Sequence, residues 1–397
     1  MTSLPLWSLA DPVTTVTKAA DFRVSLEDIV SGTGRLTDGD FANYEADGTA
    51  FDTGDVLFGR LRPYLAKSWR ADRPGTAGGD IIVMRPTSRV TSEFLGWVVQ
   101  SEPFVRRASA ETRGVKMPRT AWEYLAPVPV WTPSLKLQRR IADYLDAETA
   151  QIDGMMAELD ELIRTLDMRR VEAVAQAVHL AEADEDLPEG WVRMSMKYAV
   201  LESFTGEWGE DAGIGEVDVP CVRVADFDRA TRTVGVEDIP TIRSLPASKA
   251  NAKALRVNDL LVERSGGTSV NPVGNVVLYV GPEGAVSSNF IECVRVDEAR
   301  HDPRYWWLLQ YAAYRTGFTH MHVRQTTGIQ NLDARGFFSE PMPVPSLSEQ
   351  RRVVAEVESG MARVDAMVVD ARRLKDLLSE RRSALITAVI TGTKEIA

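Results

Sequence analysis

The chain has 397 residues, 44% of them apolar and 26% charged, so it is long enough for two or three domains with separate cores. Its net charge of −11 argues against a uniformly basic surface that coats nucleic acid. No run approaches the roughly 20 apolar residues that span a bilayer, and the first residues do not have the pattern of a signal peptide, so we expect a cytoplasmic protein.

The first 133 residues have the pattern of a domain that mixes strands and helices. Strands are predicted at 54–64 (GDVLFGRLRPY) and 80–86 (DIIVMRP), and an apolar helix at 94–100 (FLGWVVQ). A polar stretch with glycine and basic residues follows at 112–120 (TRGVKMPRT). We therefore expect a mixed α/β domain over 1–133.

A long helix is predicted within 134–186, because apolar residues recur there every seven positions, as in a coiled-coil seam. The recurring residues are Leu145, Ile152, Leu159 and Leu166, with Ile141, Met155 and Leu162 between them. A proline-rich run at 128–134 favours an extended lead-in to this helix. The segment 134–186 carries 13 acidic and 6 basic residues, which favours contact with protein over contact with DNA phosphate.

The same order of elements returns in the second half of the chain. Strands at 258–267 (NDLLVERSGG) and 289–296 (NFIECVRV) are followed by an aromatic helix at 305–311 (YWWLLQY) and a polar stretch at 323–332 (VRQTTGIQNL). A second mixed α/β domain is therefore expected over 187–345.

A second long helix is predicted within 346–397, and it begins with nearly the same residues as the first. The repeated residues are Pro133, Ser134, Leu135, Gln138, Arg139 and Arg140, which recur as Pro345, Ser346, Leu347, Gln350, Arg351 and Arg352. The second seam consists of Val357, Val364, Ala371, Leu378 and Leu385, with Val353, Met367 and Leu374 between them. Ser346 and Glu349 predict a capping box, whereas Leu137 at the matching place leaves the first helix with a weaker cap.

Catalytic motifs are missing from the sequence. It has no phosphate-binding GxxxxGK[ST] loop, no G-x-G-x-x-G turn after a strand and no G-x-S-x-G elbow. His320 and His322 have no cysteine or second histidine cluster near them in sequence, so a metal site is not expected. The two cysteines, Cys221 and Cys293, lie in apolar runs and are expected to be reduced core thiols. We predict that the chain is not an enzyme.

The doubled order of domain, proline-rich run, Ser-Leu-x-x-Gln-Arg-Arg and heptad helix resembles the specificity subunit of type I restriction–modification systems. Three further stretches are similar to that family: GDVLFGRLRPYLAK at 54–67, TGIQNL at 327–332 and the closing SALITAVITGTKEIA. The resemblance extends over essentially the whole chain. It implies an α+β fold with two target recognition domains, 1–133 and 187–345, and two spacer helices, 134–186 and 346–397, that pair as an antiparallel coiled coil.

The resemblance also implies a function and partners. Each recognition domain would read one half of a bipartite, asymmetric double-stranded DNA site, and the helices would space the two halves. The helices would also dock two methyltransferase subunits, which bind S-adenosylmethionine and methylate adenine. Two restriction subunits that use ATP and Mg could join the complex. The chain itself would hold no cofactor.

Two alternatives remain open on the sequence. The chain could serve a fused restriction–modification polypeptide as a specificity-like subunit. It could also be a coiled-coil scaffold whose α/β domains bind protein or sugar. DNA binding that weakens with salt would exclude the scaffold.

Reading a base sequence requires Arg, Lys, Asn or Gln at base edges, with other basic or hydroxyl groups on phosphate. We therefore expect the DNA-contacting residues after the central strand of each domain and in each later polar stretch. In the first domain they are Arg60, Arg62, Lys67, Arg113, Lys116 and Arg119. In the second they are Arg264, Ser265, Thr268, Asn271, Arg324, Gln325, Thr327, Gln330 and Asn331. For Arg60 and Arg264 the alternative is a buried ion pair.

A second group of candidates lies on the helices, where we expect the seam and the contacts to the partner subunits. These residues are Gln138, Arg139, Arg140, Leu145, Ile152, Leu159, Leu166, Gln350, Arg351, Arg352, Val357, Val364 and Leu378. Both copies of the helix keep the Gln-Arg-Arg sequence, which favours a contact with one shared partner.

Overall fold

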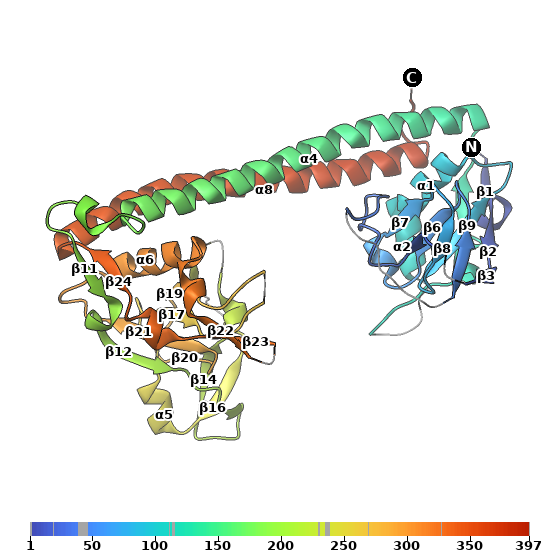
Figure 1. Cartoon of the computed structure of the whole chain (residues 1–397). Helices are drawn as coiled ribbons and strands as arrows, with labels where there is room; N and C mark the ends of the chain where they lie inside the picture. The colour runs from blue at the N-terminus through green and yellow to red at the C-terminus, as the bar shows by residue number, and fades with distance from the viewer. Residues whose placement is uncertain are drawn as a thin grey trace. The chain divides into compact units, whose positions relative to one another are not determined.

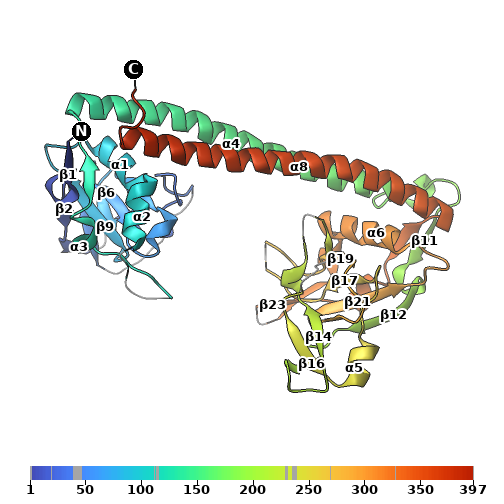
Figure 2. The same cartoon turned by 180° about the vertical axis from the view of Figure 1, so that it is seen from behind.

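Two long helices, α4 (Leu135–Ala177) and α8 (Leu347–Ile390), alternate along the chain with two mixed α/β domains in the computed structural model (Figure 1). The structure describes residues 2–18, 20–38, 47–110, 112, 116–228, 231–234, 239–268, 270–326 and 328–396. The helices run side by side in opposite directions in both views (Figure 1, Figure 2), which confirms the expected fold class. No helix in the described part of the chain is long and apolar enough to cross a membrane.

The chain divides into two compact units, which we describe separately. Unit 1 comprises Met1–Asp160 and Arg372–Ala397, and unit 2 comprises Glu161–Ala371. Each unit therefore contains one α/β domain, hereafter its head, together with a part of α4 and a part of α8. The four functional segments predicted from the sequence remain a prediction.

The head of unit 1 is built on two four-stranded sheets. The first sheet has the strand order β2 (Ala10–Val13), β9 (Ile81–Pro86), β6 (Val56–Gly59), β7 (Ser68–Arg70). The second sheet has the strand order β3 (Val16–Thr17), β5 (Gly48–Phe51), β8 (Gly75–Ala77), β4 (Arg23–Val24). A separate pair joins β1 (Ser3–Pro5) to β10 (Pro129–Trp131). The helices are α1 (Ser92–Gln100), α2 (Glu102–Ala110) and α3 (Trp122–Leu125).

The head of unit 2 repeats this plan with additions. Its main sheet has the order β12 (Val200–Thr205), β21 (Ile291–Val296), β17 (Leu260–Glu263), β19 (Val276–Tyr279), β15 (Thr233–Val234). A second sheet has the strand order β13 (Glu210–Asp211), β16 (Ile242–Leu245), β14 (Val217–Val222), β20 (Val286–Ser287). A third sheet has the strand order β18 (Ser265–Gly266), β23 (Ile329–Leu332), β22 (Val323–Thr326). Strand β11 (Val192–Ser195) pairs with β24 (Pro341–Val344), and the helices are α5 (Ala247–Ala252), α6 (Pro303–Arg315) and α7 (Ala334–Phe337).

The central strand of each head is buried on both faces. In β6, Val56 and Phe58 pack in one apolar core while Leu57 packs in another, since successive side chains point to opposite faces of a sheet. In β17, Leu260 and Leu261 are divided between two cores in the same way. Burial on both faces explains why these strands read as continuous apolar runs rather than as alternating ones.

The ends of the long helices belong to the cores of the heads. In unit 1, Leu145 of α4 and Ile386 of α8 lie in the same core as Leu6 and Phe94. In unit 2, Val174 of α4 and Val357 of α8 lie in the core that contains Trp306. Each head is therefore packed directly on the helix pair of its own unit.

The helix seam differs in one respect from the prediction. The main heptad row is confirmed as an inward row: Leu145, Ile152, Leu166, Val357, Ala371 and Leu378 are buried, and Leu159 and Val364 are half-buried. Of the residues expected between them, Ile141 and Val353 are buried, but four are wrong, because Met155, Leu162, Met367 and Leu374 are 41–48% exposed. The second inward row lies one position further along each helix and includes Thr149, Arg170, Val368 and Arg382.

The starts of the two helices are capped alike. The Ser134 hydroxyl accepts from the amide of Leu137, and the Ser346 hydroxyl accepts from the amide of Glu349, both at 3.4 Å. The expected capping box is only half formed, because the Glu349 carboxylate accepts from the guanidinium of Arg352 instead. This hydrogen bond lowers the pKa of Glu349 below its usual value.

Candidate nucleic-acid interface

The first residue after each central strand occupies the same place in the two heads. The Arg60 amide donates to Asp80 O at 2.8 Å, and the Arg60 carbonyl accepts from the Thr120 amide at 2.9 Å. The Arg264 amide and carbonyl make the corresponding bonds to Phe290 O and from the amide of Leu332, both at 2.8 Å. The sequence spacing of the two arginines differs from that of the helix repeat, but each lies five residues after an aspartate, Asp55 or Asp259, and the structure confirms that the two positions are equivalent.

Backbone bonds bring together the two clusters predicted in the first head. Leu61 and Arg119 form an isolated β-bridge, and the Arg62 amide donates to Pro118 O at 2.8 Å. Residues 60–62 therefore lie beside residues 118–120, although they are far apart in sequence. Arg113 lies outside the described residues.

Three cations of this surface have no acid partner in the described part of the chain. They are Arg60, which is half-buried, and Arg62 and Lys116, which are exposed. The Nε of Arg60 is buried and donates to no described acceptor. A buried donor without a partner costs free energy, and no contact within the described chain offsets the burial of this nitrogen. Tyr64, which our sequence reasoning missed, exposes 56% of its surface two residues after Arg62.

The other two predicted cations of this head are used within the chain. The Arg119 Nε donates to Asp80 Oδ1 at 2.9 Å, and this bond raises the pKa of Arg119. The Lys67 ammonium donates to Leu26 O at 2.8 Å from a half-buried position. The structure therefore places Lys67 against its own head rather than on a free surface.

In the second head, the small sheet β18–β23–β22 collects most of the predicted residues. Ser265 and Arg324 are the cross-strand neighbours of Asn331, so the three side chains share one face of this sheet. The Ser265 hydroxyl donates to Asn331 Oδ1 at 2.7 Å, and Arg324, 76% exposed, pairs with Asp333. This polar row offers amide, hydroxyl and guanidinium groups to a ligand.

Gln330 has a different role from the predicted one. It is 8% exposed, and its Oε1 accepts from the amide of Val273 at 3.2 Å, so it supports the loop that follows β18. In this loop the Thr268 hydroxyl accepts from the Asn271 amide at 3.0 Å, which forms a tight turn. Gln325, opposite Gln330 in the ladder, is exposed. Thr327 lies outside the described residues.

The two equivalent arginines differ in their charge environment. The Arg264 Nη1 donates to Glu292 Oε2 at 3.2 Å, so the ion pair considered from the sequence is present, although the arginine side chain is 43% exposed. Glu292 is paired across the sheet with Val262, and the residue at the matching place in the first head is Ile82. Because isoleucine carries no charge, Arg60 has no corresponding partner.

Gln138 does not lie in the helix seam or on a docking surface. Its side chain is fully buried: Oε1 accepts from the Thr91 amide at 2.8 Å, and Nε2 donates to Pro133 O at 2.9 Å and to Arg89 O at 3.0 Å. Thr91 is the N-cap of α1, so this amide ties the start of α4 to the start of α1.

Gln350 repeats these contacts in unit 2. Its side chain is 1% exposed; Oε1 accepts from the Asp302 amide at 2.9 Å, and Nε2 donates to Pro345 O at 2.9 Å. Asp302 is the N-cap of α6. The two glutamines therefore recur because each fixes a helix of its own head. In the sequence, TSEF at 91–94 and DPRY at 302–305 are typical of helix starts, and they could have indicated the N-caps to which the two glutamines bind.

The arginines that follow these glutamines are exposed. Arg139 and Arg351, at equivalent positions, have no ion-pair partner among the residues that the structure describes. Arg140 donates to a backbone carbonyl at 3.5 Å, and Arg352 pairs with two glutamates of its own helix. Arg139 and Arg351 thus remain available to a partner.

Known proteins similar to this chain are subunits of one type of enzyme complex. The "Type I restriction enzyme StySPI specificity subunit" of Salmonella potsdam is 22% identical over 290 residues, which are 72% of this chain and 61% of that subunit. The "Type I restriction enzyme EcoDI specificity subunit" of Escherichia coli is 27% identical over 157 residues, which are 38% of this chain and 32% of that subunit. The chain resembles the specificity subunit of type I restriction enzymes.

A solved structure supports the likeness at the level of the fold. It is described as showing the basis of complex assembly and conformational transition of the type I R-M system. One of its chains has a TM-score of 0.71 and 19% identity, and the match covers 98% of this chain and 97% of that one. The matched sequence spans only about three fifths of the Salmonella subunit. No family model matches the chain.

Proposed function

We propose that the chain is the DNA-specificity subunit of a type I restriction–modification complex. Each head reads one half of a bipartite, asymmetric double-stranded site, and α4 and α8 space the two halves. The chain performs no chemistry itself. S-adenosylmethionine belongs to the methyltransferase partners, and ATP and Mg to restriction partners where these are present.

The equivalence of Arg60 and Arg264 is the observation that supports this proposal most. Each follows a central strand, and each is held by backbone bonds to a polar segment that returns to the same edge of the head. The side chains around the two arginines differ, since Ile82 in the first head stands where Glu292 stands in the second, as expected where one framework reads two different sequences. Guanidinium and amide groups are the side chains that contact base edges and phosphates most often.

Repeated exposed residues support docking of two copies of one methyltransferase. Met155 and Met367 are equivalent in the repeat and 41% and 48% exposed, and Arg139 and Arg351 are exposed without ion-pair partners in the described ranges. An internal repeat presents the same side chains twice, so two identical subunits can each contact one set. Apolar and arginine side chains are enriched in protein interfaces.

Methylation mapping tests the proposed function. The chain is co-expressed with its cognate methyltransferase in a host without adenine methylation, and modified bases are located by single-molecule sequencing. We expect methylated adenine within one bipartite motif that has a fixed gap. The methyltransferase without this chain is the control and should leave the motif unmodified. A complex that forms but methylates no bipartite motif would contradict the proposal.

A further inference from the structure

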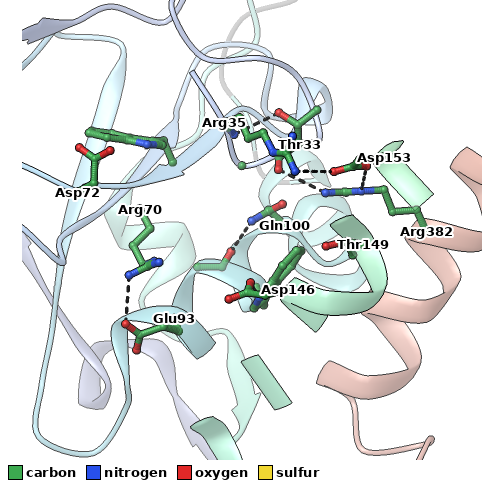
Figure 3. A pocket seen from close by; sticks show the side chains of 14 residues that line it. Thr33, Arg35, Arg70, Asp72, Glu93, Gln100, Asp146, Thr149, Asp153 and Arg382 are labelled. Carbon is green, nitrogen blue, oxygen red and sulfur yellow. Dashed lines mark hydrogen bonds and ion pairs between the residues drawn. The ribbon is translucent and has the colours of Figure 1, made fainter. Parts of the chain in front are cut away.

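A cluster of charges, in which Arg382 and Asp153 are mostly buried and Arg35 is exposed, joins the first head to both helices in unit 1 (Figure 3). Arg382 of α8, 9% exposed, donates from Nε to Asp153 Oδ1 on α4 at 2.9 Å. Its Nη1 donates to Gly32 O at 2.8 Å and its Nη2 to Thr33 O at 3.3 Å, both in a loop of the head. Arg35 of the same loop lies 3.2 Å from Asp153 Oδ2. One guanidinium and one carboxylate thus connect three segments.

Unit 2 contains a similar but larger cluster, in which Asp167 and Arg315 join one acid and two arginines. Arg170 of α4, 8% exposed, donates from Nη1 to Asp365 Oδ1 on α8 at 2.9 Å. Arg232 of the second head, also 8% exposed, donates from Nη2 to Asp365 Oδ2 at 2.8 Å. The carboxylate again accepts from one arginine of a helix and one arginine of a head.

The helix residues of the clusters are repeat equivalents, whereas the head residues are not. Asp153 corresponds to Asp365, and Arg170 corresponds to Arg382, so in antiparallel helices each acid meets the arginine of the other copy. Arg35 and Arg232 do not follow the spacing of the helix repeat, but each comes from a loop that an isolated β-bridge closes, Ile29–Leu36 in the first head and Asp228–Thr233 in the second. Two different loops therefore supply a cation to the same acid position.

Each cluster borders a cavity on one side, and its buried arginine lies over an aromatic ring, Arg382 over Trp97 and Arg232 over Tyr311. A cavity of about 350 Å³ lies beside the first cluster and is lined by Arg35, Trp97 and Arg382, among others. A second cavity of about 350 Å³ is lined by Arg232 together with Tyr311 and Arg315. At these points the ion pairs and hydrogen bonds add directional contacts to the apolar core that joins each head to its helix segments.

Buried ion pairs are a poor way to gain stability, because desolvation offsets most of their attraction, but they restrict geometry. A buried polar residue in a helix seam also fixes the register of the pair. We propose that the two clusters, which we name the head clamps, are positioning devices. Each fixes the orientation of a head on the helix segments of its unit, so that the complex accepts half-sites at one gap only. This inference rests on the proposed function.

Substitution of the clamp arginines tests the inference. Arg382→Met and Arg170→Met keep an apolar stem and remove the donors. Arg381→Met and Arg169→Met are matched controls, since these neighbouring arginines are exposed and equivalent in the repeat. In methylation maps, the clamp variants should keep both half-site sequences. Methylation at gaps one base pair shorter or longer should rise about tenfold, which corresponds to about 1.4 kcal/mol. The controls should keep one gap. An unchanged gap in both folded clamp variants would overturn the inference.

A distance measurement within unit 1 tests the head clamp in the absence of DNA. Spin labels on Glu27→Cys in the head and Glu380→Cys in α8 report their distance distribution within unit 1; both positions are exposed, while the native cysteines are buried. Arg382→Met should broaden this distribution and Arg381→Met should not. If Arg382→Met does not fold, Arg35→Gln replaces it, because that side chain is 62% exposed. An unbroadened distribution refutes the clamp, whereas absent motif methylation with wild-type chain refutes the proposed function.

Discussion

Arg60 and Arg264 show how one backbone position can serve two purposes. Arg60→Gln removes a cation that has no acid partner in the described chain, so we expect weaker DNA binding with little change in stability. A phosphate contact of this kind contributes about one unit to the slope of log affinity against log salt. Salt titrations of the assembled complex by fluorescence anisotropy measure that slope.

Arg264→Gln should behave in the opposite way. It leaves Glu292, 13% exposed, without its cation, and such a loss costs roughly 1–3 kcal/mol of folding free energy. Thermal unfolding of the two variants side by side separates the roles. Equal losses of stability in both would show that the difference in their surroundings has no consequence.

The buried glutamines are testable by stability alone. Gln138→Met removes an acceptor from the Thr91 amide and two donors from backbone carbonyls, so we expect unit 1 to lose roughly 1–3 kcal/mol of unfolding free energy. Gln151→Met, on an exposed face of the same helix, is the control. Calorimetry should show a lower melting temperature for the first variant only.

The roles of single residues were the least well predicted from the sequence. Sequence reasoning selected Gln138, Gln330 and Lys67 as contact residues because their side-chain chemistry fits a ligand. Each of these side chains is instead satisfied by a backbone group far away in the sequence, such as Thr91 N or Leu26 O. Only the folded chain reveals such partners.

Among the elements, the segment of α4 in unit 2 carries a pH-sensitive contact. Burial opposes ionisation of Asp167, but the hydrogen bond and charge of Arg315, with the charges of Arg170 and Arg232, outweigh it and lower the pKa of Asp167 below its ordinary value of 3.8. The ionised group therefore stabilises the fold above pH 3.8, and this contribution disappears as pH falls through the lowered pKa.

Asp167→Asn should abolish that dependence. Relative to wild type, the variant should melt at a lower temperature at neutral pH, and the difference should shrink as the pH falls below 3.8. Asp370→Asn, at an exposed position of α8, is the control. A difference between wild type and Asp167→Asn that is constant with pH would refute the assignment.

The helices and central strands were the elements best predicted from sequence. Apolar residues at seven-residue spacing indicated both α4 and α8, and continuous apolar runs indicated β6 and β17. The second seam row was misplaced by one position, because Met155 and Leu162 are as apolar as true seam residues. In the structure polar residues, Arg170 and Arg382, occupy part of that row, and hydrophobic patterning cannot identify them.

At the scale of the whole molecule, helix length should set the gap between half-sites. Seven residues inserted after Leu159 and seven after Ala371 preserve the heptad and lengthen each helix by about 10 Å. We expect the unread gap to grow by about three base pairs, since each base pair rises about 3.4 Å. Methylation mapping measures this directly.

An insertion outside both helices is the matched control for that experiment. Seven residues placed between Glu185 and Asp186, in the segment between α4 and β11, should leave the gap unchanged. If the helix insertion also leaves it unchanged while the motif is still methylated, the helices do not act as spacers.

The packing of α8 into the first head has a consequence for synthesis on the ribosome. Ile386, Val389 and Ile390 complete the core that contains Leu6 and Phe94, so this core cannot close until residues far apart in the sequence have all been synthesised. The first head must remain partly open, with apolar surface exposed to chaperones, while the whole second head is translated. A premature stop codon shortly before residue 386 would therefore damage the first head, although the lesion lies far from most of that head in the sequence.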